Sequence, residues 1–218
     1  MKLNNYAFNQ IRNKNDVKKF TEFLRHQTTA EYGGNQIFVG AKSHLLHNPE
    51  ELAEFIYLLT IHKKKHKLKK FLEVGYSTGI NNTILNKFFN FEQIVAVDNF
   101  SAEINSNSLL VNLRRKNLTL VCGNSDSKRV LNTVKDYGEF DLIFVDGSHQ
   151  YKDVKKDLEN YSKLLSKDGI LAVHDIHNIE HPGVNKAWNE FKKNKKFTFK
   201  EIVNKKYYFI CGVGLAFN

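Results

Sequence analysis

Glycine and acidic residues gather between residues 73 and 98 in a pattern that can bind a nucleotide-like molecule. The segment Glu73 to Gly79 reads E-V-G-Y-S-T-G, and Asp98 follows 19 residues later. Glycines let the backbone come close to a ligand and take positive φ angles. A carboxylate at Asp98 can accept hydrogen bonds from both hydroxyls of a ribose.

The turn itself differs from one that binds a dinucleotide. A pyrophosphate cradle needs G-x-G-x-x-G, whose backbone N–H groups face the phosphate, and Glu73 stands where its first glycine would be. A carboxylate there repels a pyrophosphate but suits a cationic amino-acid group. S-adenosyl-L-methionine carries such a group, a sulfonium and a ribose but no phosphate, so the turn favours it over NAD.

A second set of polar residues lies between residues 146 and 175. Asp146 and His149 belong to D-G-S-H-Q-Y, and His174 and Asp175 follow a short apolar run. Two carboxylates in one cleft repel each other unless a cation or a proton lies between them. Oxygen ligands beside an imidazole suit Mg²⁺ or Mn²⁺. We therefore expect a metal, or an oriented hydroxyl group, at Asp146, His174 and Asp175.

The same segment contains the candidate general base. A histidine at position 149 can take the proton of a hydroxyl group near neutral pH, with Asp146 as the second catalytic residue. His177 and His181 follow in the next loop and remain alternative bases or metal partners. The other histidines are interpreted as surface or helix-end residues: His26, His44, His47, His62 and His66.

These residues need a scaffold that brings strand ends together. From residue 70, short apolar runs alternate with helical patterns, with strands expected at 71–74, 93–97, 118–122, 141–145 and 170–173. Helices are expected from the glycine turn to about 89 and at 101–116, 127–135, 154–165 and 184–191. Two further strands close the chain in residues 200–217. This order indicates an α/β fold with a mostly parallel sheet, which binds ligands beyond the carboxyl ends of its strands.

The first 45 residues are expected to form a helical or lid segment packed on the core. A helix is expected at 17–26, and Tyr32 and Phe38 could line a lid over the site. Residues 46–218 would form the ligand-binding part of a single domain. Its first helix has clear start signals, because Asn48 can cap it and Pro49 fits its first turn.

Composition excludes several classes of protein. The chain has 218 residues, of which 41% are hydrophobic and 26% charged, as in ordinary globular domains. Cys122 and Cys211 are too few and too far apart for a disulfide scaffold or a thiolate zinc site, and their apolar neighbours predict that both are buried. We find no apolar run of about 18 residues and no signal-peptide pattern, so we expect a cytoplasmic protein without a membrane span.

The net charge of +10 raises the question of nucleic acid. Lysines cluster at 63–70 and 192–196, after expected helices, where positive charge meets the negative end of the helix dipole. A nucleic-acid footprint would also need stacking aromatics or a known motif, and the sequence has neither nearby. Nucleic acid is therefore disfavoured, and an anionic small acceptor stays compatible with the charge.

Over about residues 45–218 the sequence resembles the class I S-adenosylmethionine-dependent methyltransferases. The shared features are the motif E-x-G-x-x-x-G, the acid Asp98 at the end of the second expected strand, and the alternation of strands and helices. The resemblance implies a Rossmann-like, mostly parallel seven-stranded sheet with an antiparallel C-terminal strand and helices on both faces. It implies S-adenosyl-L-methionine as cofactor and S-adenosyl-L-homocysteine as product. The implied cofactor-binding residues are Glu73, Gly75, Ser77, Gly79, Asp98, Asn124, Ser125 and Asp146.

A narrower resemblance is to the branch of sugar and macrolide O-methyltransferases and cephalosporin hydroxylase-like proteins, which is methyltransferase family 24-like. Its motifs here are Asp146-Gly147, His149, Tyr151, Asp157, Gly169, His174-Asp175, Pro182-Gly183-Val184 and Trp188. This branch implies methyl transfer to a hydroxyl of a small acceptor, such as a sugar, nucleotide-linked sugar or natural-product precursor. Its members often hold a divalent metal with acids at these strand ends and often form homo-oligomers.

One departure from the branch concerns the metal, because His174 stands where the branch usually has an acid. Three alternatives remain open. The chain could be an RNA methyltransferase that uses its lysine runs, or a cofactor-binding protein without transferase activity. An NAD oxidoreductase is disfavoured by the missing phosphate-binding glycine.

Overall fold

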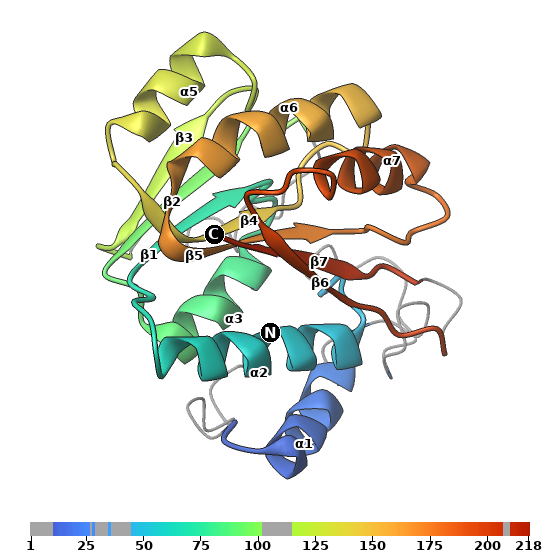
Figure 1. Ribbon diagram of the computed structural model, residues 1–218. Helices are drawn as coiled ribbons and strands as arrows, with labels where there is room; N and C mark the ends of the chain where they lie inside the picture. Colours follow the sequence, from blue (N-terminus) through green and yellow to red (C-terminus); the bar gives the residue numbers. More distant parts are fainter. Residues whose placement is uncertain (1–10, 27, 29–34, 36–44, 102–114, 207–209) are drawn as a thin grey trace.

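The computed structural model describes residues 11–26, 28, 35, 45–101, 115–206 and 210–218 (Figure 1). Seven strands form one sheet in the order β3-β2-β1-β4-β5-β7-β6. Their bounds are β1 Lys70–Val74, β2 Gln93–Asp98, β3 Leu118–Cys122, β4 Phe140–Val145, β5 Leu165–His174, β6 Thr198–Ile202 and β7 Val213–Phe217. The expected strands are all present, and the α/β fold is confirmed.

The strand directions agree with the sequence pattern. Strands β1 to β5 pair in parallel, whereas β7 runs antiparallel to β5 and β6 antiparallel to β7. The strand order reverses beside β1, between β2 and β4. A crevice for ligands opens beyond the carboxyl ends of parallel strands at such a switch point.

Helices cover both faces of the sheet (Figure 1). The helices are α1 Lys14–Arg25, α2 Pro49–Lys63, α3 Ile80–Phe89, α5 Lys128–Lys135, α6 Tyr151–Tyr161 and α7 Pro182–Phe191, with a short 3₁₀ turn at Ser162–Leu164. One buried apolar cluster joins the sheet to α1, α2 and α3, and a second joins it to α5, α6 and α7. Most of the helix expected at 101–116 lies outside the described residues.

The starts of α1 and α2 follow from their capping residues. Asn13 and Asp16 form a reciprocal capping box at α1. The Asn48 side chain accepts the backbone N–H groups of Glu50 and Glu51, and Pro49 occupies the first turn of α2. These caps fix where α2 begins, and residues 45–48 therefore enter it from the carboxyl-end edge of the sheet. The proposed boundary at residue 45 stays a prediction.

The clearest difference from the expected boundaries lies between α6 and β5. The helix expected at 154–165 is α helix only to Tyr161, because Leu165 pairs with Phe140 as the first residue of β5. A positive φ of 62° at Asp168 marks an irregularity within β5. Leu165 is buried in either conformation, so its hydrophobicity alone does not distinguish a helix from a strand.

The two cysteines differ in burial. Cys211 is fully buried, as expected, but Cys122 is exposed. Cys122 is the last residue of β3 and follows the buried Val121, and successive residues of a strand point to opposite faces of the sheet. The prediction of burial was wrong for Cys122. Among the described helices, none has the length and apolar character to cross a membrane.

Candidate active site

The glycine turn after β1 is pressed against the end of β4. Gly75 has a φ of +93°, and a Cβ atom on it would lie 2.0 Å from the carbonyl oxygen of Asp146. The Gly75 N–H donates to the carbonyl of Val97, and the Asp146 N–H donates to that of Val74. These hydrogen bonds join the ends of β1, β2 and β4 at a position that only glycine can occupy.

A cleft of about 750 Å³ opens beyond these strand ends. Ten of the sequence-predicted site residues line it: Glu73, Gly75, Ser77, Asp98, Asn124, Ser125, Asp146, His149, His174 and Asp175. Gly79 does not line it but sits behind the turn as the N-cap of α3, with a φ of +71°. The cleft also contains residues that the sequence did not single out, among them His47, Asn81 and Asn99.

The Asp98 side chain is held at the end of β2 by backbone groups. One carboxylate oxygen accepts the N–H of Ser77 at 2.7 Å, and the other accepts the N–H of Phe100 at 2.6 Å. Each carboxylate oxygen has a second lone pair, so both can still accept a hydroxyl. Beside it, Asn99 donates to the side-chain oxygen of Asn124 at 3.1 Å.

Glu73 is buried at the inner end of the cleft. Its two carboxylate oxygens accept hydrogen bonds from the amides of Asn81 and Asn82, at 2.8 and 2.7 Å. Burial nevertheless raises the pKa of Glu73 to about 8. A cationic group placed beside it would favour the charged carboxylate. The signal that could have revealed Asn81 and Asn82 is their place in the first turn of α3, directly after the glycine turn.

Asp146, His174 and Asp175 meet at the ends of the adjacent strands β4 and β5. Nδ1 of His174 lies 3.3 Å from Oδ1 of Asp146 and 3.5 Å from Oδ2 of Asp175. Asp175 has a φ of +61° and accepts a hydrogen bond from the Asn178 amide at 3.0 Å. The two strand-end acids, Asp146 and Asp175, therefore meet at one ring nitrogen of His174.

The positive charge of His174 and the negative charges of Asp146 and Asp175 stabilise one another. Burial alone would lower the pKa of His174, but Asp175 and Asp146 raise it well above its usual value. Burial alone would raise the pKa of Asp175, but His174 and hydrogen bonds from His149 and Asn178 hold it well below its usual range. The imidazolium of His174 thus supplies a positive charge between the two carboxylates.

His149 reaches the same cluster from the start of α6. Its Nε2 lies 3.2 Å from Oδ2 of Asp175. This hydrogen bond raises the pKa of His149, although partial burial opposes the shift. The ring of His181 stacks on that of His149, with centroids 3.7 Å apart. Of the two alternative bases, His181 lies in the cleft, whereas His177 contacts Glu201 at 3.3 Å.

His47 contradicts its interpretation as a surface or helix-end residue. The side chain is buried, its ring centroid lies 4.0 Å from that of His174, and its Nε2 lies 3.9 Å from Oδ2 of Asp146. Burial, reinforced by the charge of His174, lowers the pKa of His47 well below its usual value. The sequence did not reveal this because only the packing of α2 brings residue 47 to the strand ends.

Other histidines and Trp188 lie outside the cleft. His26 is exposed, and the half-buried rings of His62 and His66 stack on each other at the end of α2, as expected. His44, Tyr32 and Phe38 lie outside the described residues. Trp188 is a core residue, as predicted, and its ring N–H donates to Glu201 at 2.7 Å.

The residues of the cleft fit a divalent metal. His47, Asp146 and His174 each offer a ligand atom, and these atoms lie within 4.8 Å of one another. His149, Asp175 and His181 form a second such set. Imidazoles and carboxylates are ordinary ligands of Mn²⁺, Fe²⁺ and Zn²⁺. Nδ1 of His47 is buried without a hydrogen-bond partner among the described residues, while Nε2 is the nitrogen nearer Asp146.

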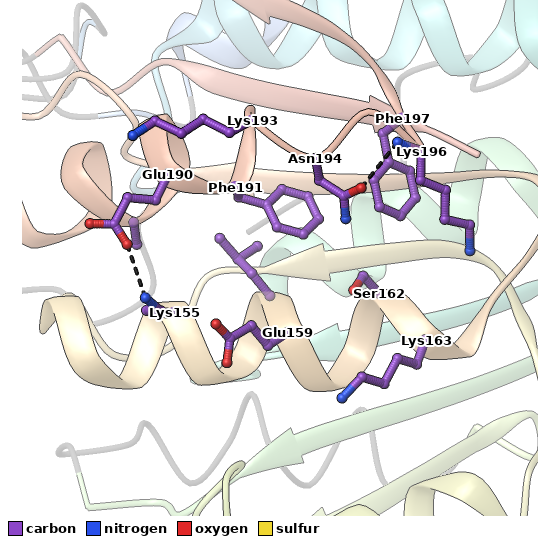
Figure 2. A pocket seen from close by; sticks show the side chains of 12 residues that line it. Lys155, Glu159, Ser162, Lys163, Glu190, Phe191, Lys193, Asn194, Lys196 and Phe197 are labelled. Carbon is purple, nitrogen blue, oxygen red and sulfur yellow. Dashed lines mark hydrogen bonds and ion pairs between the residues drawn. The ribbon is translucent and has the colours of Figure 1, made fainter.

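A second hollow, of about 640 Å³, lies between α6 and α7 (Figure 2). Phe191 and Phe197 pack on each other there with centroids 5.4 Å apart. Lys155 pairs with Glu190 at 3.0 Å, and Lys193 and Lys196 of the 192–196 run also line the hollow. This hollow, here called the α6–α7 groove, has none of the predicted site residues in its lining.

Comparisons with known proteins agree with this architecture. Residues 72–176 match a family model described as a methyltransferase domain. No curated protein matches the chain. Solved structures share its fold, and one is an O-methyltransferase from Bacillus cereus in complex with SAH, with a TM-score of 0.61 and 11% identity over 96% of this chain and 93% of that one.

Two further structures show how widely the fold is used. Cofactor-bound Rv0187 from MTB has a TM-score of 0.60 and 15% identity, over 93% of this chain and 89% of that one. The N-methyltransferase NodS from Bradyrhizobium japonicum WM9 has a TM-score of 0.57 and 16% identity, over 80% of this chain and 99% of that one. The matched segment runs from β1 to the end of β5 and includes most of the cleft. Residues 72–176, nearly half of the chain, thus match a methyltransferase domain, and the chain shares its fold with solved methyltransferases.

Proposed function

We propose that this methyltransferase transfers the methyl group of S-adenosyl-L-methionine to a hydroxyl group of a small acceptor. The observation that carries the proposal is the contact between His149 and Asp175, in the same cleft as Asp98 and Glu73. This contact provides a base with an orienting partner, which removal of a hydroxyl proton requires.

The cofactor would lie along the ends of β1, β2 and β3. Asp98 would accept the two ribose hydroxyls, while Glu73 and the backbone around Gly75 and Ser77 would hold the methionine portion. Asn124 and Ser125, after β3, would meet the adenine. This direction places the methyl group toward β4 and β5, where Asp146 and His149 stand.

The methyl transfer step forms one bond to carbon and breaks another. The acceptor oxygen forms a bond to the methyl carbon as the bond from that carbon to sulfur breaks, and the hydroxyl proton passes to His149. Because Asp175 holds Nε2 of His149, Nδ1 is the ring nitrogen that would accept this proton. Asp175 would also stabilise the imidazolium that forms. Alignment of oxygen, carbon and sulfur contributes much of the rate.

A divalent metal such as Mg²⁺ or Mn²⁺ would be held by Asp146, His174 and Asp175. When bound, it would lower the pKa of the acceptor hydroxyl and fix its orientation. Without it, the protonated ring of His174 would keep the two acids in place.

The acceptor that we favour is a sugar or a glycan or natural-product precursor, including anionic and nucleotide-linked sugars. The net charge of +10 suits an anionic acceptor. Assembly into a homo-oligomer is part of the same proposal, since members of this branch often associate.

Binding of S-adenosyl-L-homocysteine tests the cofactor part. Calorimetry should show one site per chain for this ligand and no binding of NADH. Asp98→Ala should weaken binding by about 10- to 100-fold, because two hydrogen bonds to a charged group are lost. Asp136→Ala, at an exposed acid at the end of α5, is the matched control. The absence of any heat with S-adenosyl-L-homocysteine would refute the proposed function.

Turnover with candidate acceptors tests the remainder. Release of S-adenosyl-L-homocysteine should depend on a hydroxylated sugar or sugar nucleotide. The rival interpretation as an RNA methyltransferase predicts turnover with RNA instead, with affinity that falls steeply as salt rises. A protein that binds the cofactor without transferring methyl to either class of acceptor would be an accessory protein.

A further inference from the structure

Residue His47 has no role in the function proposed above, although it lies in the same cleft. It belongs to the segment that enters α2, far in sequence from the strand-end acids, and its side chain is 3% exposed. Nδ1 has no hydrogen-bond partner among the described residues, and Nε2 lies 3.9 Å from Asp146, beyond hydrogen-bond distance. A buried ring nitrogen without a hydrogen bond, such as Nδ1 here, is costly to a folded protein.

The positions of the three side chains suit a shared metal ion. Two ligands bound at about 2.1 Å from one ion lie about 3 to 4 Å apart. Asp146 lies 3.3 Å from Nδ1 of His174 through one oxygen and 3.9 Å from Nε2 of His47 through the other. The rings of His47 and His174 lie 4.0 Å apart between centroids. Small side-chain rotations would therefore complete a three-ligand set.

We propose that His47 is a metal ligand, and that His47, Asp146 and His174 bind a transition ion such as Mn²⁺, Fe²⁺ or Zn²⁺ in preference to Mg²⁺. The proposal rests on the proposed function for the role of the ion, but the binding is a property of these residues. Two imidazoles beside one carboxylate favour the ions that take nitrogen ligands. Mg²⁺ instead prefers oxygen ligands and retains waters.

Binding of metal salts to the full chain tests this selectivity. Calorimetry with MnCl₂, ZnSO₄ and MgCl₂ should show one Mn²⁺ or Zn²⁺ ion per chain, bound at least about tenfold more tightly than Mg²⁺. His47→Gln should weaken Mn²⁺ and Zn²⁺ by about tenfold or more and leave Mg²⁺ unchanged. His66→Gln, at a half-buried histidine at the far end of α2, should change none of the three. Equal affinity for Mg²⁺ and Mn²⁺, or an unchanged affinity in His47→Gln, would overturn the proposal.

A spectroscopic measurement on the unmodified chain removes any dependence on how the variant folds. Pulsed electron paramagnetic resonance of one equivalent of Mn²⁺ should show coupling to two imidazole nitrogens. A spectrum without nitrogen coupling would also overturn the proposal. Titration with S-adenosyl-L-homocysteine separates a failure of the metal proposal from a failure of the proposed function. If the chain binds this ligand but does not prefer Mn²⁺ or Zn²⁺ over Mg²⁺, only the metal proposal is rejected. If it binds the metal selectively but not this ligand, only the methyltransferase function is rejected.

Discussion

Two hollows of similar size, about 750 Å³ at the strand ends and about 640 Å³ between α6 and α7, differ in how their charged groups are held. In the strand-end cleft, Glu73, His174 and Asp175 are buried, and their pKa values shift because burial and neighbouring charges act strongly there. In the α6–α7 groove, charged groups such as Lys155 and Glu190 form ion pairs at the surface.

The difference follows from the backbone. Parallel strands end at one edge and deliver polar residues there from several segments, while the sheet removes them from water. Two packed helices instead present side chains that can turn toward solvent. The volumes of the two hollows therefore do not distinguish them, whereas the buried, convergent acids and histidines make the strand-end cleft the candidate site.

The largest effect is expected at Gly75. In Gly75→Ala the new Cβ would meet the Asp146 carbonyl at 2.0 Å, so the ends of β1 and β4 could not stay together. We expect loss of the folded protein, or destabilisation by more than about 4 kcal/mol, in denaturant unfolding. Gly138→Ala is the control, because it too has positive φ, +80°, but its nearest atom is 3.7 Å away. It should cost only about 1 to 2 kcal/mol. An equal loss of stability in both variants would show that the positive φ angle, and not the contact between the strand ends, causes the destabilisation.

The next effect concerns the base. His149→Gln should lower kcat by about 10²- to 10⁴-fold and leave the affinity for S-adenosyl-L-homocysteine unchanged. Turnover assays and calorimetry measure the two quantities. His177→Gln, outside the cleft, should retain activity. If His181→Gln loses activity and His149→Gln does not, the stacked partner is the base.

A smaller effect concerns two carboxylates on the same helix. Asp157 is buried near Ser125 of the cleft, and burial raises its pKa to about 7. Glu159 is exposed in the lining of the α6–α7 groove. A raised pKa means that the folded state holds the proton more tightly than the unfolded chain. Asp157 therefore lowers stability as pH rises from about 4 to about 7. Asp157→Asn should flatten this decline by a few kcal/mol at most, in urea unfolding at several pH values.

Glu159→Gln is the matched change on the exposed side of α6. It should leave the pH dependence of stability as it is, because this side chain is exposed to solvent. A similar flattening in both variants would contradict the distinction between the cleft and the groove.

The smallest effect is expected in the α6–α7 groove. A double variant, Lys193→Ala with Lys196→Ala, should keep methyl transfer unchanged and alter stability by no more than about 0.5 kcal/mol. Turnover and thermal unfolding measure both. A large loss of activity that depends on salt would instead assign the groove to an acidic partner and favour the RNA interpretation.

Much of the fold could be predicted because local signals agreed with one another. Apolar runs such as Ile143 to Val145 alternate with capped helices, and Asn48 and Pro49 mark the start of α2. The sequence was misleading where one residue suits two environments. Leu165 is apolar enough for a helix or a strand, and Cys122 points to the opposite face of β3 from the buried Val121, so its apolar neighbours do not predict its burial.

The candidate site divides in the same way. The sequence by itself determined the glycine turn, the strand-end acids and the histidine after Asp146, because residue type and spacing within one segment carry that information. Only the tertiary structure decided that Asn81 and Asn82 hold Glu73, that His181 stacks on His149 and that His47 joins His174. These contacts depend on how separate segments pack against the sheet, and packing over long separations leaves no periodic mark in the sequence.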